Sequence, residues 1–263
     1  MWREILVYND DKMAISSLLP SLRASFNQDL FHIKQITASD IHKGILQRHA
    51  SRFLVLPGII GEISPYTEQL GNGEMHEVQK FMSHGRNALL TICAGSAFIS
   101  KKTLYMPPHG TPRGRMSNIP LFNGLARGPV GPYGRACTAD SRFSDVIVVP
   151  VRYKDMDGTW KDTGVCYGNG PALYPDDPND PSVEILCTYT DIPDNPAAIL
   201  RQSVGTGVAY MSCVLPEIAH QHVSPHPGLH NAQQLMADLK PHEPGRKALW
   251  DNLTTRIKRD LGL

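Results

Sequence analysis

The sequence predicts an α/β protein whose sheet is parallel in its first half and largely antiparallel in its second half. Over residues 1–100, short runs of aliphatic and β-branched side chains alternate with helical stretches. This alternation is typical of βαβ units built around a parallel sheet. From about residue 145 onward, β-rich runs follow one another with hairpin turns between them, which favours antiparallel pairing.

The first half contains four expected strands and two longer helices. Leu18, Leu22 and Phe26 recur at helical spacing and predict a helix over about residues 14–26. A second helix over about residues 74–83 ends where a glycine follows. The expected strands cover residues 5–8, 31–36, 53–56 and 89–92, and a short helix opens near residues 39–40.

The second half begins with a segment rich in proline, glycine and arginine, at about residues 101–144, which we expect to be an irregular insertion rather than another βαβ unit. The tail has apolar residues at helical spacing and predicts an amphipathic helix over about residues 246–261. No segment resembles a flexible linker, so residues 1–263 are expected to form a single domain. The strands expected between insertion and tail cover residues 145–151, 165–167, 183–189, 198–203 and 208–213.

Composition and charge exclude several classes of protein. The chain has 263 residues, 26 of them basic and 25 acidic, with a net charge of +1. A nearly neutral chain creates no global field that attracts nucleic acid or an anionic membrane, so we expect neither as a partner. No apolar run approaches the roughly 20 residues that cross a bilayer, and the N-terminus lacks a signal-peptide pattern, so a cytoplasmic location is expected.

The cysteines and the missing nucleotide motifs bear on cofactors. Five cysteines without a CxxC pair predict free thiols rather than a disulfide framework or a zinc site. No phosphate-binding glycine loop follows a strand. We therefore expect neither a metal nor an organic cofactor.

The most informative segment is residues 91–97, where an expected strand leads into a helix through small residues. A cysteine in such a turn is held exposed at the sheet edge, with backbone N–H groups as oxyanion donors. Cys93 is therefore the candidate nucleophile, and the donors are expected to be the N–H of Ala94 and an N–H from Gly58 or Ile59. The alternative is that Cys93 is a small buried residue at a strand end, a common place for cysteine.

Several short motifs occur in an order that resembles a known family. ILVYNDD lies near the N-terminus, LPG follows the third expected strand and TICAGSAF spans the turn at Cys93; later come YGNG, VEILCTYT and the pair Pro216-Glu217. This arrangement resembles class I glutamine amidotransferase-like domains, and it is most similar to the biotin-protein ligase N-terminal domain family over about residues 3–222. The resemblance implies a flavodoxin-like three-layer sandwich with a mixed sheet, here in a stand-alone form.

The resemblance also implies a catalytic triad, one member of which differs in this chain. In amidotransferases of this class a cysteine attacks the glutamine amide, a histidine acts as base and a glutamate orients the histidine. These roles fall on Cys93, position 215 and Glu217, and position 215 is a leucine. Without a proton acceptor, thiolate chemistry loses orders of magnitude in rate.

Two interpretations of the missing base are open. In the first, His220 or His222 substitutes as base, and the protein is a hydrolase or acyl-transferase acting on a small amide or ester. In the second, Cys93 belongs to a pocket at the strand ends, where open α/β sheets bind ligands, and the protein is a catalytically silent ligand-binding or regulatory module. Both predict a small molecule as substrate or ligand, and a protein partner is left open.

Other candidate ligand contacts come from the insertion and from YGNG. The insertion carries many more lysines and arginines than acidic residues, which suits a phosphate or carboxylate unless these side chains pair with acids elsewhere. From it we expect Arg127 and Tyr133 to contact the ligand, together with Asn169 of YGNG; the run GPVGPY that ends at Tyr133 resembles a segment of the same family. The histidines between residues 220 and 230 have the chemistry of metal ligands, but Pro225 and Pro227 break any helix that would align them.

Overall fold

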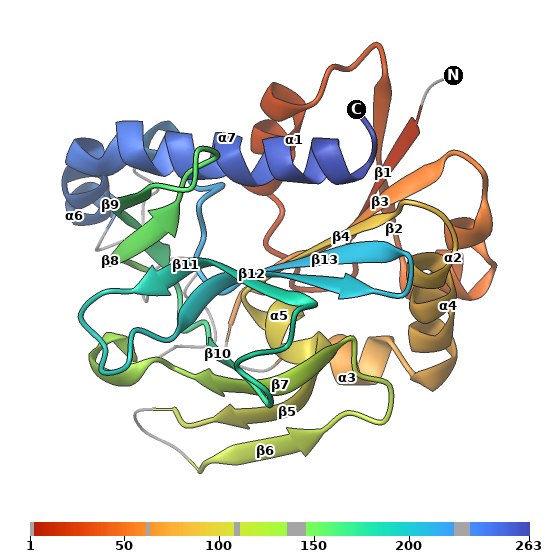
Figure 1. Ribbon diagram of the computed structural model, residues 1–263, viewed down its shortest axis with the longest axis horizontal. Helices are drawn as coiled ribbons and strands as arrows, with labels where there is room; N and C mark the ends of the chain where they lie inside the picture. The colour runs from red at the N-terminus through yellow and green to blue at the C-terminus, as the bar shows by residue number, and fades with distance from the viewer. Residues whose placement is uncertain (1–2, 62–63, 108–110, 136–145, 224–231) are drawn as a thin grey trace.

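One mixed sheet organises the described part of the chain, which comprises residues 3–61, 64–107, 111–135, 146–223 and 232–263 of a computed structural model (Figure 1). Its parallel half contains the four strands expected from the first hundred residues and one strand from much later in the chain. These strands lie side by side in the order β2 (Phe31–Ile36), β1 (Arg3–Tyr8), β3 (Ser51–Leu56), β4 (Ala88–Ile92) and β13 (Gly207–Ser212).

The rest of the sheet is antiparallel apart from one pair. Beyond β13 follow β12 (Ala197–Val204), β10 (Ala172–Pro175), β7 (Phe122–Gly128), β5 (Ser100–Tyr105) and β6 (Arg113–Met116). A branch from β12 contains β11 (Val183–Tyr189), β8 (Ile147–Lys154) and β9 (Trp160–Tyr167). Only β5 and β7 run parallel among these described strands, so the expected mixed sheet with an antiparallel second half is confirmed.

Helices cover both faces of the sheet and give the three layers of a flavodoxin-type fold (Figure 1). One face carries α1 (Leu18–Ser25), α6 (Ala232–Leu239) and α7 (Glu243–Asp260), and the other carries α2 (Ala38–His42), α3 (Tyr66–Gln69), α4 (Asn72–Ser83) and α5 (Ala94–Ile99). Short 3-10 turns are η1 (Ile45–Gln47), η2 (Gly131–Tyr133), η3 (His220–His222) and η4 (Lys240–His242).

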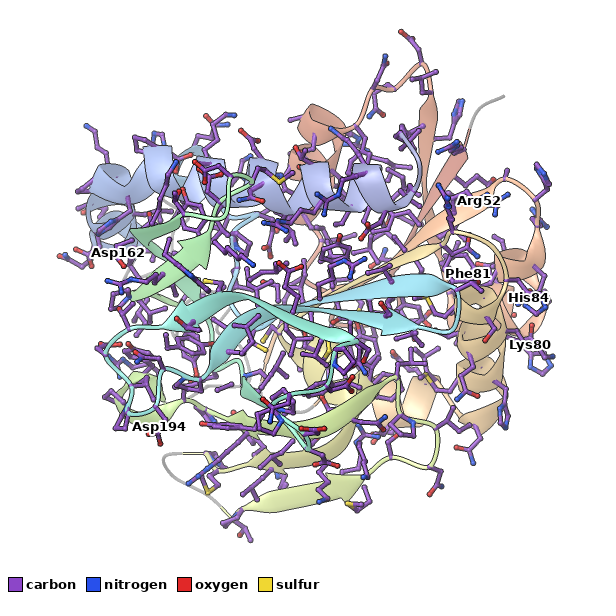
Figure 2. The ribbon with its side chains drawn as sticks, viewed as in Figure 1. Arg52, Lys80, Phe81, His84, Asp162 and Asp194 are labelled. Carbon is purple, nitrogen blue, oxygen red and sulfur yellow. The ribbon has the colours of Figure 1, made fainter. Side chains whose placement is uncertain are left out.

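Strand alternation divides the interior into two cores. On β1, Ile5 and Val7 face the core under α1 and α7, whereas Leu6 and Tyr8 face the core under α2, α4 and α5. Side chains from the strands fill the space on both sides of the sheet (Figure 2). The buried strands of the parallel half are apolar on both faces for this reason.

The first helix is shorter than the sequence pattern predicts. It begins at Leu18 rather than near residue 14, because the preceding residues pair with the segment after β3. Met13 forms an antiparallel bridge with Ile59, and the N–H of Ala14 donates to the carbonyl of Gly58 at 2.9 Å. A tertiary pairing has replaced the first helical turn, and it fixes the segment that contains Gly58.

The expectation of an irregular insertion at residues 101–144 is wrong for much of its described part, which contains β5, β6 and β7. Pro107 and Pro112 lie between β5 and β6, Pro120 lies between β6 and β7, and Pro129 follows β7. The prolines therefore mark strand ends rather than a lack of structure. Within β7 the buried positions alternate, and Gly124 allows the close approach of the Tyr174 carbonyl, only 2.5 Å from where a Cβ would lie.

The amphipathic tail helix is confirmed as α7. Leu249, Trp250, Leu253 and Ile257 are buried against the sheet. The indole N–H of Trp250 also donates to the hydroxyl of Ser25 at the end of α1, at 2.8 Å. The sequence pattern did not predict α6 or the four-residue strand β10. No helix in the described ranges is both long and apolar enough to cross a membrane.

We predict that Gly95→Ala destabilises the fold and that Gly73→Ala does not. A Cβ on Gly95 would lie 2.5 Å from the Leu56 carbonyl oxygen, whereas a Cβ on Gly73, within α4, meets no atom within 4 Å. Urea denaturation should show the free energy of unfolding lowered by about 1–3 kcal/mol for Gly95→Ala and raised by about 0.5–1 kcal/mol for Gly73→Ala. Equal stability of the Gly95→Ala variant and the wild type would contradict this packing of α5 on β3.

Candidate ligand site at the Cys93 elbow

Cys93 occupies a sharp turn between β4 and α5, as the sequence predicts. Its backbone has φ 49° and ψ −108°, a conformation that a residue with a side chain rarely adopts. Its N–H donates to the carbonyl of Ser212 at 2.7 Å and so extends the β4–β13 ladder by one bond. Its carbonyl accepts from the N–H groups of Ser96 and Ala97, which begins α5.

A network of buried hydroxyl groups fixes this turn. The hydroxyl of Ser96 lies 2.9 Å from that of Thr91 and 3.0 Å from the carbonyl of Ser212, and all three residues are fully buried. Because buried polar groups need partners, the network holds α5, β4 and β13 together at the turn that contains Cys93. The sequence signals this network only by polar residues inside apolar runs, and their spacing does not show which of them meet.

The residues expected to donate to an oxyanion are brought together at the elbow. A Cβ placed on Gly58 would lie 3.4 Å from the Cβ of Cys93. The bridge to residues 12–14 uses the carbonyl of Gly58 and the N–H of Ile60, so the N–H groups of Gly58 and Ile59 are not part of it. Ala94 begins α5, and the first N–H groups of a helix have no partner within the helix.

The YGNG segment forms the opposite wall of the elbow. The thiol of Cys93 donates to the carbonyl of Gly168 at 3.5 Å. A Cβ on Gly170 would lie 3.6 Å from the Cys93 sulfur and 2.2 Å from the Cys213 carbonyl oxygen, so glycine alone fits between them. Both glycines belong to the YGNG motif, but the sequence alone does not show that they lie against Cys93.

Leu215 lies next to this wall, where the resemblance implies a histidine. Its N–H donates to the carbonyl of Cys166 at 2.8 Å, in an isolated antiparallel bridge beside β9. Its Cδ1 atom is 3.6 Å from where a Cβ on Gly168 would lie, and a methyl of Val146 is 3.4 Å from the same point. Among the described residues, the atoms nearest to this point of Gly168 are therefore methyl groups.

Glu217 is a buried acid two residues beyond Leu215. Its carbonyl accepts from the hydroxyl of Ser21 at 2.7 Å. Burial raises the pKa of its carboxyl group to about 8, although the nearby charge of Arg246 acts in the opposite direction. Its Oε2 atom has no hydrogen-bond partner among the described residues. At pH 7 the side chain is therefore largely neutral, and position 215 gives it no imidazole to orient.

The two histidines considered as substitute bases lie in η3 and make contacts of their own. His220 turns toward α7. Its backbone N–H donates to the carboxylate of Glu243 at 3.1 Å, and its ring Nδ1 lies 3.4 Å from the same oxygen. Arg246 holds that carboxylate at 2.6 Å and 3.0 Å. The Nδ1 atom of His222 accepts from the N–H of Ala219 at 3.4 Å. The remaining histidines of this segment, His226 and His230, lie outside the described residues.

The candidate ligand contacts Tyr133 and Asn169 are close together, and Arg127 lies apart on β7. The side-chain amide of Asn169 accepts from the N–H and donates to the carbonyl of Arg135, both at 2.9 Å. Tyr133 is buried against Tyr167 with ring centroids 5.5 Å apart. Arg127 is exposed, and its charge partly opposes the rise in the pKa of Tyr174 that burial causes.

Several cations of the insertion have partners within the fold. Lys101 lies 2.7 Å from a carboxylate oxygen of Asp176, and the guanidinium of Arg115 donates to the carbonyls of Ala97 and Phe98. These contacts support the interpretation that the basic residues pair within the protein. Arg142 lies outside the described residues.

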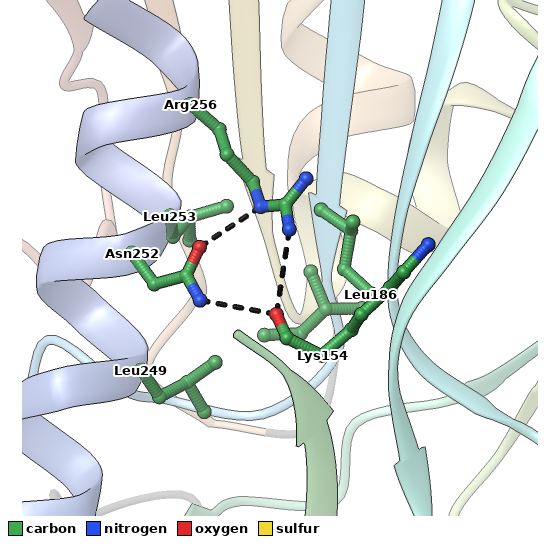
Figure 3. A pocket seen from close by; sticks show the side chains of 7 residues that line it. Lys154, Leu186, Leu249, Asn252, Leu253 and Arg256 are labelled. Carbon is green, nitrogen blue, oxygen red and sulfur yellow. Dashed lines mark hydrogen bonds between the residues drawn. The ribbon is translucent and has the colours of Figure 1, made fainter. Parts of the chain in front are cut away.

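A small cavity between α7 and the sheet is separate from the elbow (Figure 3). Its volume of about 10 Å³ holds at most one water molecule. Asn252 and Arg256 hydrogen-bond to each other at 2.8 Å beside it, and both donate to the carbonyl of Lys154. The cavity is a packing feature of the α7 interface and is too small for a substrate.

Comparison with known proteins decides the family. Residues 3–261 match the family described as "Biotin-protein ligase, N terminal". The chain belongs to this family. It is also 25% identical over 214 residues to an uncharacterized protein of Chlamydia muridarum, covering 80% of this chain and 78% of that protein.

The solved structures support the fold of this biotin-protein ligase N-terminal family member. A glutamine amidotransferase from Thermotoga maritima superposes with a TM-score of 0.56 at 13% identity, and the match covers all of both chains. At this identity the likeness concerns the fold alone. The expected class I glutamine amidotransferase-like architecture is therefore confirmed.

We predict that Glu217→Gln removes a pH dependence of stability. The folded state binds the Glu217 proton up to about pH 8 and the unfolded state only up to about pH 4.5, so ionisation destabilises the fold as pH rises between these values. The wild type should lose about 1.4 kcal/mol relative to Glu217→Gln for each pH unit in this window. Denaturation at pH 5, 6, 7 and 8 measures the difference.

The exposed residue Glu68 provides the control for this series. Glu68→Gln should follow the wild type at every pH, because an exposed carboxylate is solvated in both states. A constant difference between the wild type and Glu217→Gln from pH 5 to pH 8 would show that Glu217 is ionised throughout.

Proposed function

We propose that the protein is a glutamine amidotransferase-like module that binds a small molecule at the elbow, with Cys93 as part of the pocket rather than as an efficient nucleophile. The observation that carries this proposal is the contact of the thiol with the Gly168 carbonyl, bordered by Leu215. A carbonyl oxygen accepts a hydrogen bond from a thiol but does not remove its proton. The elbow therefore has the shape of a nucleophile site, and a leucine stands at position 215, where the resemblance implies the catalytic histidine.

Retention of the binding geometry supports a ligand at this place. Gly58 and Gly170 lie against the Cys93 side chain and let backbone approach it closely. Gly58, Ile59 and Ala94 have N–H groups suited to a carbonyl or carboxylate oxygen. Open α/β sheets bind ligands at the carboxyl ends of their strands, and Cys93 follows the carboxyl end of β4. The partner that we propose is accordingly a small molecule.

A second function, slow acyl transfer by Cys93 on a small amide or ester, is favoured by the backbone of this residue. A φ of 49° at a residue with a side chain is strained by about 1–3 kcal/mol, and such strain persists mostly at functional sites. Under this alternative a base other than residue 215 accepts the thiol proton, and His220 or His222 has the right chemistry once it leaves its present contacts.

We predict that Leu215→His activates Cys93. The wild type should form an adduct with an electrophilic chloroketone analogue of glutamine slowly, at the rate of an ordinary thiol. An imidazole at position 215 accepts the thiol proton, so the adduct should form at least about tenfold faster, as intact-protein mass spectrometry over time would show. Leu215→Asn is the matched control, because it is polar and similar in size but provides no base.

The same experiment separates the two functions. A wild type that reacts as fast as Leu215→His, with the adduct absent in Cys93→Ser, would contradict the proposal and support acyl transfer with another base. In that case, loss of the adduct in His220→Ala or in His222→Ala would identify the base.

A further inference from the structure

Tyr133 carries a buried hydroxyl without a hydrogen-bond partner in the described part of the chain. The residue is only 6% exposed. A buried hydroxyl that is not paired destabilises the fold, because it has lost its bonds to water and gained none. A water molecule or a bound ligand can supply the hydrogen bond that the described residues do not.

The neighbouring tyrosines all have partners. The hydroxyl of Tyr167 donates to the Gly170 carbonyl and accepts from the N–H of Val130, both at 2.7 Å. The hydroxyl of Tyr189 donates to the Pro171 carbonyl at 3.0 Å. The ring of Tyr133 lies 5.5 Å from that of Tyr167 and 6.1 Å from that of Tyr189. Within this cluster of three rings, Tyr133 alone has a hydroxyl without a hydrogen-bond partner among the described residues.

The segment that carries Tyr133 is fixed at both ends, so the unpaired hydroxyl does not reflect a loose turn. Val130 is bound by the hydroxyl of Tyr167, and the backbone of Arg135 is clamped by the side chain of Asn169. Asn169 directly follows Gly168, whose carbonyl contacts the Cys93 thiol. The Tyr133 segment is therefore tied to the same wall as the elbow.

The surroundings of this wall are apolar. Tyr133 and Leu215 belong to one core cluster, against which Cys93 packs, and Val146 and Leu215 place methyl groups beside Gly168. A charged ligand group placed among them would lose its hydration, and the cation of this segment, Arg135, is exposed and donates to the carbonyls of Pro132 and Gly134 instead. A ligand that fits is neutral and largely apolar, with one oxygen that accepts the Tyr133 proton.

We propose that the Tyr133 hydroxyl anchors the ligand and that this ligand is a neutral carbonyl compound with an apolar or aromatic body, such as a carboxamide, ketone or ester. The inference rests on the proposed ligand-binding function and specifies its chemistry. It differs from the glutamine expected of an amidotransferase, whose amino and carboxylate groups are both charged.

The test uses the full chain and three fluorinated probes observed by fluorine NMR: 4-fluorobenzamide, 4-fluoroacetophenone and the charged 4-fluorobenzoate. The two neutral probes should bind the wild type more tightly than the benzoate does. Tyr133→Phe should lower the affinity for the two neutral probes by about fivefold to tenfold, because it removes one hydrogen bond and leaves the ring in place. Tyr174→Phe, a partly exposed tyrosine on β10, should leave binding unchanged.

Thermal unfolding without a probe provides a second measurement. Tyr133→Phe should raise the Tm, because it removes an unpaired buried hydroxyl, while Tyr174→Phe should not change it. A lowered Tm for Tyr133→Phe would show that the hydroxyl is already paired, and it would overturn the inference.

The outcomes distinguish this inference from the proposed function. Alkylation of Cys93 with iodoacetamide should block the neutral probes. Suppose alkylation blocks the neutral probes, but the Tyr133→Phe variant binds them as tightly as the wild type, or the benzoate binds best. The elbow then still binds ligands, and Tyr133 is not the anchor for a neutral one. If no probe binds, or if alkylation leaves binding unchanged, the elbow is not the binding site and both proposals fail.

Discussion

The hydrogen bond from the N–H of Cys93 to the carbonyl of Ser212 is the constraint on which the site depends. It continues the pairing of β4 and β13 for one residue past the end of β4, while the positive φ of Cys93 turns the chain into α5. The buried hydroxyl of Ser96 donates a hydrogen bond to the same carbonyl. The strain in the Cys93 backbone is thus offset by hydrogen bonds from β13 and α5, which hold this backbone in place.

Position 215 shows how a fold can keep a site while the chemistry of that site changes. The bridge between Leu215 and Cys166 uses backbone atoms only, so this pairing does not depend on the side chain at position 215. The nearby acid, Glu217, is buried, and its raised pKa keeps it mostly protonated at neutral pH. The fold shared with an amidotransferase therefore does not determine the activity, which depends on the side chains at these positions.

The sequence predicts the parallel strands and α7 well, because their apolar residues repeat with a period that packing against one sheet requires. It predicts the start of α1 and the insertion poorly, because Met13 and the strands after α5 are fixed by partners distant in the chain. The elbow was visible in the sequence since its parts are consecutive. The clamp of Asn169 on Arg135 was not, because it joins side chain to backbone across 34 residues.

The placement of β13 beside β4 has a consequence for how the protein is made. The residues that it brings together are more than one hundred positions apart, and contacts of such long range form slowly because a large loop must close first. During synthesis, β1 to β4 leave the ribosome long before β13 exists. Cys93 therefore has no Ser212 to bond to in the nascent chain, and its constrained geometry is a late product of folding.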